Sequence, residues 1–354
     1  MSTQIFTYKQ SFTLESGVTL PQYHLSYTTH GKLNASRDNV VWIFHALTAN
    51  SNPLEWWPGL VGDGKFFDPA KYFIICVNKP GSPYGSISPL SINPQTNEPY
   101  YHDLPFFSIR DMIKMYQELK NHLGIRKIFI ALGGSTGGMQ LLEWAIEEPE
   151  LFEHIVPIAT NATLSPWAIA FNASQRMAIE ADSTWLERRP DAGQKGLAAA
   201  RSIALLSYRH YNGYDITQPR DKAFVALSQG VEFAADNYQR YQGLKLVNRY
   251  NAICYYRLTQ SMDSHDVGLN RGGVQAALQK IKARTLVIGI KSDVLYPIGE
   301  QEYLRDTIRG AELLSIASDF GHDGFLLEYE KIETALKKFI EEDRSSHHLK
   351  VVNQ

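Results

Sequence analysis

The most reactive-looking stretch of this chain is Gly133-Gly134-Ser135-Thr136-Gly137, which follows an apolar run and precedes apolar residues at helical spacing. A strand, a tight turn and a helix in this order expose a serine oxygen above a sheet. The glycines two residues before and after the serine leave room for the strand and helix to cross. The helix N-terminus adds N–H groups and partial positive charge beside a developing oxyanion. The pattern predicts that Ser135 is the nucleophile of an acyl-transfer or hydrolytic reaction.

A serine nucleophile needs a general base, and that base needs an orienting carboxylate. With a nucleophile on such a turn, the order along the chain is serine, carboxylate, histidine. Asp293 follows the apolar run 285–290, and His322 follows the run 313–317 in a loop with glycines on both sides. We therefore predict that Asp293 and His322 complete a catalytic triad. The alternatives for the carboxylate are Asp263, Asp266 and Asp319.

An oxyanion in such a site is held by two backbone N–H groups. The residue after the nucleophile, Thr136, supplies one of them. The other is expected from the loop after an early strand, at residues 45–48, where Leu47 is the best candidate. Neither donation needs a particular side chain, so both assignments rest on position in the chain.

Composition sets the class of protein. The chain has 354 residues, 44% hydrophobic and 20% charged, with a formal net charge of −2. This length allows one large domain or a core with an inserted subdomain. The charge gives no reason to expect nucleic acid or a membrane surface as partner, and no apolar run approaches the roughly 20 residues of a membrane span. Two cysteines, and no His/Cys/Glu set at zinc spacing, predict a cytoplasmic enzyme without a metal.

Short apolar runs alternate with helical patterns along most of the chain. The runs are residues 40–44, 72–77, 127–132, 154–159, 285–290 and 313–317. The helical patterns are residues 109–123, 138–148, 297–309 and 324–342. Strands and helices in alternation predict an α/β protein with a mostly parallel sheet covered on both faces. Residues 6–29 alternate polar and apolar side chains instead, which predicts an antiparallel edge.

The strand signal disappears between residues 161 and 273. Helical patterns there cover residues 165–181, 193–208, 223–229 and 232–259. We interpret residues 161–273 as a helical cap over the active site, because ligands of open α/β sheets bind beyond the carboxyl ends of the strands. His265 could line the site from this cap. The expected domains are a core at residues 1–160 and 274–342, the cap at 161–273, and a polar C-terminal tail at 343–354 that frays.

Over nearly its whole length the chain resembles the homoserine O-acetyltransferase family, whose members are α/β-hydrolase-fold acyltransferases of methionine biosynthesis. The resemblance rests on segments that match the family in the same order along the chain. The matching segments are residues 45–48, 91–94, 109–112, 133–145, 169–172, 240–243, 262–266, 292–293 and 321–323. The resemblance implies an α/β-hydrolase fold with a helical lid and a homodimer formed through that lid. It also implies that acetyl-CoA is a co-substrate and that no metal or bound cofactor takes part.

The resemblance also implies roles for individual residues. Ser135, Asp293 and His322 match the family's triad. Asp323 matches the residue that binds the substrate amino group, and Arg209 is the best match to the arginine that holds the carboxylate. Arg201 is the alternative for that arginine, and Tyr241 is expected in the same pocket.

Two segments depart from the family pattern. The residue after the nucleophile is usually Met and here is Thr136. The family's Cys-Tyr-Gly-Ser-Thr-Gly-Pro run appears at residues 83–89 as Pro-Tyr-Gly-Ser-Ile-Ser-Pro. Neither departure changes the expected mechanism, but both bear on the identity of the acyl donor and of the acceptor.

The expected reaction has two steps, with acetyl transfer from acetyl-CoA to Ser135 and then to the hydroxyl of L-homoserine. The alternatives are succinyl-CoA as donor, another hydroxy amino acid as acceptor, or an esterase or thioesterase with the same triad. A binding protein on an inactive hydrolase fold is a further alternative, although the ordered triad counts against it.

Overall fold

The computed structural model describes residues 3–220, 222–223 and 232–352. Its centre is an eight-stranded sheet in the order β1-β4-β6-β5-β9-β10-β13-β14. The strands are β1 (Gln4–Tyr8), β4 (Tyr23–His30), β6 (Phe73–Val77), β5 (Val40–Phe44), β9 (Ile128–Gly134), β10 (Phe152–Ile158), β13 (Arg284–Ile290) and β14 (Glu312–Ile316). From β6 to β14 neighbouring strands are parallel, whereas β1 and β4 form an antiparallel edge.

The sheet confirms the predicted α/β class. Every predicted apolar run is a strand, and the runs 40–44 and 285–290 match β5 and β13 almost residue for residue. The run Val40–Phe44 is buried throughout, as expected for a strand covered on both faces. The alternating N-terminal segment forms the antiparallel pair β1 and β4, as predicted.

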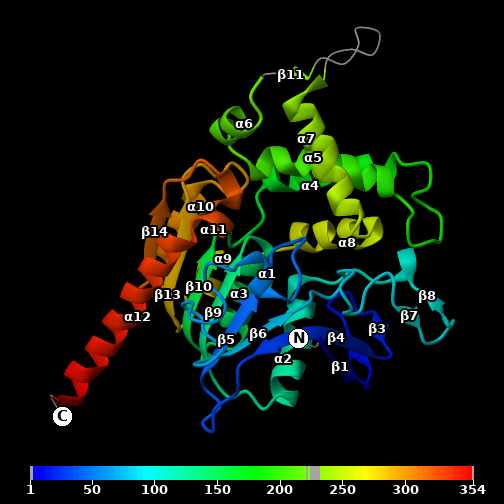
Figure 1. Ribbon diagram of the computed structural model, residues 1–354. Coiled ribbons are helices and arrows are strands. Elements are labelled where there is room, and N and C mark those ends of the chain that lie inside the picture. The colour runs from blue at the N-terminus through cyan, green and yellow to red at the C-terminus, as the bar shows by residue number, and fades with distance from the viewer. Residues whose placement is uncertain (1–2, 221, 224–231, 353–354) are drawn as a thin grey trace.

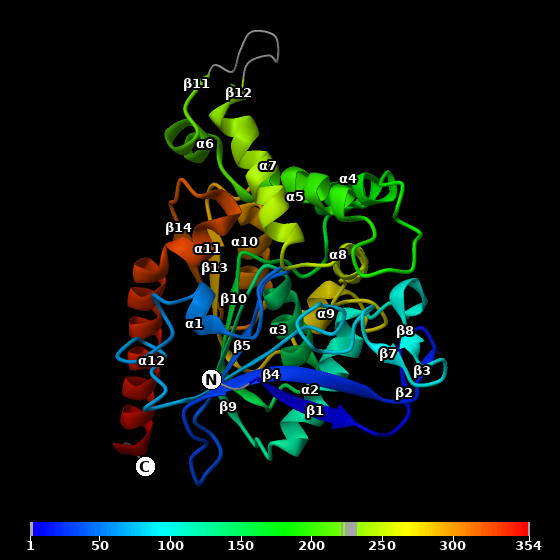
Figure 2. The ribbon, with the colours of Figure 1, turned by 45° about the vertical axis from the view of Figure 1, so that its right-hand side comes forward.

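Helices cover both faces of the sheet (Figures 1 and 2). On one face lie α2 (Ile109–His122), α3 (Thr136–Glu147), α9 (Val274–Leu278) and α10 (Ile298–Thr307). On the other lie α1 (Pro53–Trp56) and α12 (Tyr329–Val352). Each layer has its own apolar core, with Trp42 and Trp144 crossing at 4.8 Å between ring centroids in the first. The parallel strands thus end in one direction, toward the segment 161–273.

The segment 161–273 lies beyond the carboxyl ends of the parallel strands (Figure 1). It contains α4 (Pro166–Glu180), α5 (Gln194–Tyr208), α6 (Tyr211–Thr217), α7 (Ala234–Val247) and α8 (Ala252–Asp263). A short hairpin of β11 (Lys222–Ala223) and β12 (Glu232–Phe233) stands between α6 and α7. Further small hairpins are formed by β2 (Phe12–Thr13) with β3 (Thr19–Leu20) and by β7 (Ile92–Asn93) with β8 (Glu98–Pro99). No described helix is long and apolar enough to cross a membrane.

Some predicted boundaries are wrong. The predicted helix 232–259 is two helices, because the Asn251 side chain accepts from the Cys254 N–H at 3.0 Å and begins α8 there. Of the predicted helix 223–229, Ala223 lies in β11, and residues 224–229 lie outside the described residues. At the C-terminus α12 continues to Val352 instead of ending at residue 342. Residues 343–352 contain neither Gly nor Pro to stop a helix.

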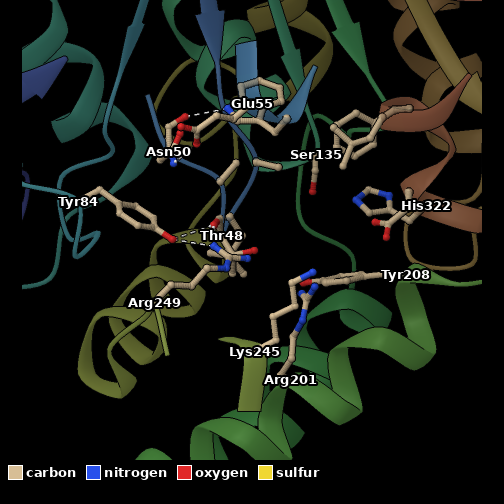
Figure 3. A pocket seen from close by; sticks show the side chains of 17 residues that line it. Thr48, Asn50, Glu55, Tyr84, Ser135, Arg201, Tyr208, Lys245, Arg249 and His322 are labelled. Carbon is tan, nitrogen blue, oxygen red and sulfur yellow. Dashed lines mark hydrogen bonds between the residues drawn. The ribbon is translucent and has the colours of Figure 1, made fainter. Parts of the chain in front are cut away.

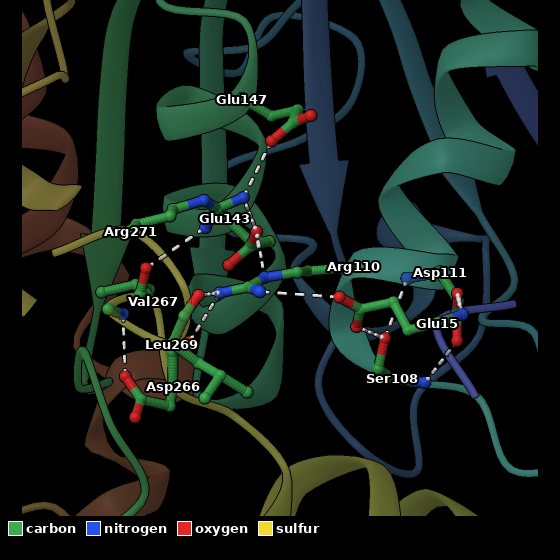
Figure 4. A network of polar contacts seen from close by, with 11 residues as sticks. Glu15, Ser108, Arg110, Asp111, Glu143, Glu147, Asp266, Val267, Leu269 and Arg271 are labelled. Carbon is green, nitrogen blue, oxygen red and sulfur yellow. Dashed lines mark hydrogen bonds and ion pairs between the residues drawn. The ribbon is translucent and has the colours of Figure 1, made fainter. Parts of the chain in front are cut away.

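A buried ionic network joins the end of the 161–273 segment to α3, the helix that follows Ser135 (Figure 4). Glu143 on α3 is 2% exposed and pairs with Arg110 at 3.0 Å and closely with Arg271. Arg110 also donates to the carbonyls of Asp266 and Leu269 at 3.0 and 2.8 Å. The network accounts for the arginine in the motif at 109–112, whereas Asp266 contributes only its backbone carbonyl. It holds the returning chain against the helix that follows Ser135.

We expect Glu143→Gln to lower the free energy of unfolding by about 3 kcal/mol, because it leaves two largely buried guanidinium groups without their shared carboxylate. The matched control is Glu147→Gln, since Glu147 also pairs with Arg271, at 2.8 Å, but its side chain is 45% exposed. The control should cost less than about 1 kcal/mol. Urea denaturation measures both, and equal losses would contradict the assignment of Glu143 as the network's centre.

Candidate active site

Ser135 occupies the turn between β9 and α3 in a backbone conformation rare for a residue with a side chain. Its φ and ψ are 57° and −125°. Its N–H donates to the carbonyl of Ile158 at 2.9 Å, and its carbonyl accepts the Thr160 hydroxyl at 2.9 Å. Strained residues of this kind persist only where the surroundings fix them, and they cluster at functional sites. The turn therefore has the form of a nucleophile elbow.

Glycines at 133 and 137 are required by close backbone contacts. A Cβ added to Gly133 would lie 2.3 Å from the carbonyl oxygen of Gly137, and one added to Gly137 would lie 2.3 Å from that of Phe44. No side chain fits at either position without moving the backbone. The spacing seen in the sequence thus has a steric cause in the fold.

His322 and Asp293 lie together next to the elbow. The His322 Nδ1 and Asp293 Oδ2 atoms are 2.6 Å apart, and both side chains are buried. Asp293 follows β13, and its other oxygen accepts the N–H groups of Leu295 and Tyr296 at 2.8 and 2.9 Å. His322 lies in the 3₁₀ turn η2 (Gly321–Asp323) after β14. The structure thus brings together the three side chains predicted as a triad.

The electrostatics around His322 suit a general base. Burial opposes the charged imidazole, but the charge of Asp293 and its hydrogen bond outweigh burial, so the pKa of His322 is raised above its ordinary value. With Nδ1 bonded to the carboxylate, Nε2 is the nitrogen left to accept a proton. Figure 3 shows the imidazole beside the Ser135 hydroxyl, with both facing one cavity. This arrangement can take a proton from a serine during nucleophilic attack.

The alternative acids and the competing histidine lie elsewhere. Asp263 pairs with Arg176 at 2.6 Å. Asp266 accepts the Gly268 N–H at 2.8 Å, and Asp319 is exposed. His265 is buried, its Nε2 lies 3.0 Å from the carbonyl oxygen of Asn161, and burial lowers its pKa to about 4. None of these side chains lines the cavity in front of Ser135.

That cavity has a volume of about 610 Å³ between the sheet and the helices above it. Ser135, His322 and Asp323 lie on its core side, and Tyr84 stands at one wall. Cations come from the opposite side: Arg201 on α5, Lys245 on α7 and Arg249 just after it. The remaining lining residues are Ala46, Leu47, Thr48, Ala49, Asn50, Glu55, Trp56, Tyr208, Phe325 and Leu326. The cavity can therefore take an anionic ligand next to a nucleophile.

The two candidate oxyanion donors come from the turn after Ser135 and from the loop after β5. Thr136 is the first residue of α3, where the backbone N–H has no partner within the helix. Its side chain is 1% exposed, and among the described residues its hydroxyl has no hydrogen-bond partner. Leu47 lines the cavity in the loop after β5, and its carbonyl accepts the Tyr250 hydroxyl at 2.9 Å. A residue of the segment 161–273 thus fixes the loop that carries Leu47.

The structure separates Arg209 from Arg201. Arg209 does not line the cavity; its guanidinium forms a close ion pair with Asp323 and donates to the Tyr238 hydroxyl at 3.2 Å. Arg201 lines the cavity and lies 5.5 Å from the centroid of the Tyr208 ring. Arg201 and Tyr208 are two turns apart on one face of α5, whereas Arg209 caps the helix and faces another way.

Tyr241 is not brought into the site. Its side chain is 57% exposed on α7 and does not line the cavity. Lys245, one helical turn further on, does line it. Tyr241 and Lys245 thus lie on the same helix, and only Lys245 faces the cavity. Within the described residues no cluster of His, Cys, Asp and Glu has the arrangement of a metal site.

Comparisons with known proteins agree on one family. The family model described as "alpha/beta hydrolase fold" matches residues 39–329. A homoserine O-acetyltransferase of Cyclobacterium marinum is 47% identical over 96% of this chain and 95% of its own. The crystal structure of homoserine O-acetyltransferase from Bacillus anthracis superposes with a TM-score of 0.87, at 26% identity over 96% of this chain and 97% of that one. Esterase E22 superposes with a TM-score of 0.86 at 22% identity, over 96% and 99%.

The raised pKa of His322 predicts a pH dependence for the reactivity of Ser135. Only neutral imidazole accepts a proton, so labelling of Ser135 by a serine-reactive fluorophosphonate should fall as the pH drops through a pKa above 6.5. In Asp293→Asn the carboxylate charge is gone, so this midpoint should move to lower pH and the rate should fall on the order of 10⁴-fold.

The matched control is Asp319→Asn, on the exposed loop before His322. It should leave both the rate and the midpoint unchanged. Labelling of Asp293→Asn at the wild-type rate and midpoint would contradict the role of Asp293.

Proposed function

This chain belongs to the α/β-hydrolase fold family and, within it, to the homoserine O-acetyltransferases, and we propose that it transfers the acetyl group of acetyl-CoA to the side-chain hydroxyl of L-homoserine. The observation that carries the proposal is the identity of 47% over 96% of the chain to such an enzyme. The cavity supports it, because a buried serine, an imidazole and both signs of charge face one enclosed space. The product would be an activated homoserine for methionine biosynthesis.

In the first step Ser135 becomes acetylated. His322 takes the proton from the Ser135 hydroxyl while its oxygen attacks the thioester carbonyl. The N–H groups of Leu47 and Thr136 hold the oxyanion of the tetrahedral intermediate. When this intermediate collapses, the carbon–sulfur bond breaks and His322 returns the proton to the CoA thiolate. The buried Asp293 carboxylate, 2.6 Å from Nδ1, stabilises the imidazolium formed in between.

In the second step the acetyl group passes to the amino acid. His322 takes the proton from the homoserine hydroxyl, whose oxygen attacks the acetyl carbonyl on Ser135. The same N–H groups hold the second oxyanion, and the serine oxygen leaves with the proton from His322. Free Ser135 is regenerated, so each turnover releases one CoA and one ester. Positioning of the hydroxyl supplies much of the acceleration, because reactants held in line avoid the entropy of meeting.

We assign the amino acid's two charged groups to opposite sides of the cavity. Asp323, next to His322, receives the ammonium group, and Arg201 receives the carboxylate. The Tyr208 ring supports this placement, since it lies 5.5 Å from the Arg201 guanidinium and 5.7 Å from the His322 ring. Arg209 acts behind the site, where its ion pair orients Asp323. Arg201, and not the predicted Arg209, is thus the proposed ligand of the substrate carboxylate.

The segment 161–273 acts as a lid in this proposal. Water would hydrolyse the acetyl-enzyme, so the lid must exclude it while the amino acid binds. Contacts from the lid to the core support this role: Tyr250 donates to the Leu47 carbonyl at 2.9 Å, and Arg249 donates to the Tyr84 hydroxyl at 2.6 Å. The core is then residues 1–160 and 274–342.

The lid is also the proposed surface of a homodimer. Large apolar side chains are exposed on helices that pack against one another, with Met177 on α4 at 66%, Leu206 on α5 at 59% and Leu244 on α7 at 62%. Pairing of two lids would bury them. Sedimentation velocity should give twice the chain mass of 40.0 kDa, and a single-chain mass would contradict the dimer.

The buried free cysteines Cys76 and Cys254 fit a reducing compartment, which supports the cytoplasm as the protein's location.

Thiol release from acetyl-CoA tests the reaction and its rivals together. Release should require L-homoserine, mass spectrometry should identify O-acetylhomoserine, and Ser135→Ala should abolish both. Release without an acceptor would favour an esterase or thioesterase instead. Activity with succinyl-CoA alone, or with another hydroxy amino acid alone, would correct the donor or the acceptor. Inertness toward all of them would favour a binding protein.

Arg201→Gln should raise the KM for L-homoserine about 10- to 100-fold, because a charge-assisted hydrogen bond to a carboxylate is lost. The acetylation of Ser135 by acetyl-CoA, followed as a burst, should change far less. Arg209→Gln is the matched comparison, since Arg201 lies in the middle of α5, Arg209 directly follows its last residue, and only Arg201 lines the cavity. A larger rise in KM for Arg209→Gln than for Arg201→Gln would restore Arg209 as the carboxylate ligand.

A further inference from the structure

A lysine lies buried beneath the loop that carries Leu47. Lys79 follows β6 and His45 follows β5, so these residues meet at the carboxyl ends of adjacent parallel strands. Lys79 is 1% exposed and His45 is also 1% exposed. In the described part of the chain no carboxylate forms an ion pair with Lys79. A buried amine without a counter-charge costs stability, so its hydrogen bonds call for an explanation.

The His45 ring is held by both of its nitrogens. Its Nε2 accepts the backbone N–H of Lys79 at 3.1 Å, and its Nδ1 lies 2.7 Å from the carbonyl oxygen of Ala46. This pairing requires the tautomer in which Nδ1 carries the proton and donates to Ala46. Burial and the charge of Lys79 lower the pKa of His45 well below its ordinary value, which keeps the ring neutral.

The Ala46 carbonyl fixes the direction of the Leu47 N–H. Both groups belong to one peptide unit, and because that unit is planar and trans, they point in opposite directions. The Ala46 oxygen accepts from His45 on one side and from the Ala49 N–H, at 3.2 Å, on the other. A ring that holds this oxygen therefore also aims the N–H proposed to bind the oxyanion.

The Lys79 amine holds the preceding peptide unit, between His45 and Ala46. Its Nζ donates closely to the His45 carbonyl and lies 3.3 Å from His45 Nδ1. The His45 carbonyl in turn lies against the elbow, since a Cβ added to Gly137 would be 3.2 Å from its oxygen. The amine thus contacts the loop that carries Leu47, through a carbonyl that itself lies against Gly137 of the elbow.

We propose that Lys79 is a positioning residue for the oxyanion hole, which, through the His45 carbonyl and ring, holds the Ala46–Leu47 peptide so that the Leu47 N–H faces the cavity. Lys79 touches no substrate in this role. The proposal rests on the proposed serine mechanism but not on the identity of the acceptor. Burial lowers the pKa of Lys79 to about 7. An amine donates to a carbonyl in either protonation state, so the contact survives a change of charge.

The test compares two variants of the full chain with a surface control. Both substitutions shorten the side chain by one atom; Lys79→Met removes its donors, whereas Lys79→Gln retains a donor. Lys71→Met, at an exposed lysine, is the control. The readouts are the rate of Ser135 labelling by a fluorophosphonate, the burst rate with p-nitrophenyl acetate, the KM for L-homoserine and the Tm.

We expect Lys79→Met to label and acetylate about 10- to 100-fold more slowly, part of the loss seen when an oxyanion donor is removed. Lys79→Gln should lie between Met and wild type. The KM for L-homoserine should stay within about twofold, and the Tm should not fall, since a buried amine without a carboxylate is removed. If Lys79→Met does not fold, the rate of Lys79→Gln carries the test.

Labelling and burst rates within twofold of wild type would overturn the proposal. So would rates that fall only in proportion to a loss of folded protein. A wild-type protein that neither labels nor shows a burst would instead overturn the serine mechanism, which separates the two failures.

Discussion

The tight backbone crossing at Ser135 is the constraint on which the rest of the structure depends. The turn from β9 into α3 fits only because residues 133 and 137 have no side chains. It places a strained serine at the carboxyl end of a central strand, within reach of the loops that follow β5, β13 and β14. A parallel sheet collects such loops at one edge, so residues far apart in the sequence meet there. Asp293 and His322 come together for this reason, and so do His45 and Lys79.

The parts of the structure with strong local causes could be predicted from the sequence. Buried strands such as Val40–Phe44 are continuous apolar runs, and the glycine spacing around Ser135 has a steric origin. Asp293 and His322 could be placed because each follows a recognisable strand. The two parts of the segment 232–259 could not, because one asparagine decides where α8 begins.

The rest of the site depends on directions that the sequence does not contain. Arg201 lies in the middle of α5 and Arg209 directly follows its last residue, and only the packing of this helix and its C-cap against the core decides which one reaches the cavity. The same holds for Tyr241 and Lys245 on α7, because only the packing of the helix decides that the lysine, and not the tyrosine, faces the cavity. Nothing in the sequence indicates that Lys79 is buried, because a lysine after a strand is usually exposed to solvent. Its burial follows from loops that close over the end of β6.

In the proposed mechanism Ser135 carries the acetyl group between donor and acceptor. This can be measured by intact-protein and peptide mass spectrometry of the enzyme mixed with acetyl-CoA alone. We expect one acetyl group on the peptide that contains Ser135, discharged rapidly by L-homoserine but not by L-alanine, which has no hydroxyl. An enzyme that forms O-acetylhomoserine without acetylating Ser135, or an adduct that decays equally fast with and without homoserine, would contradict it.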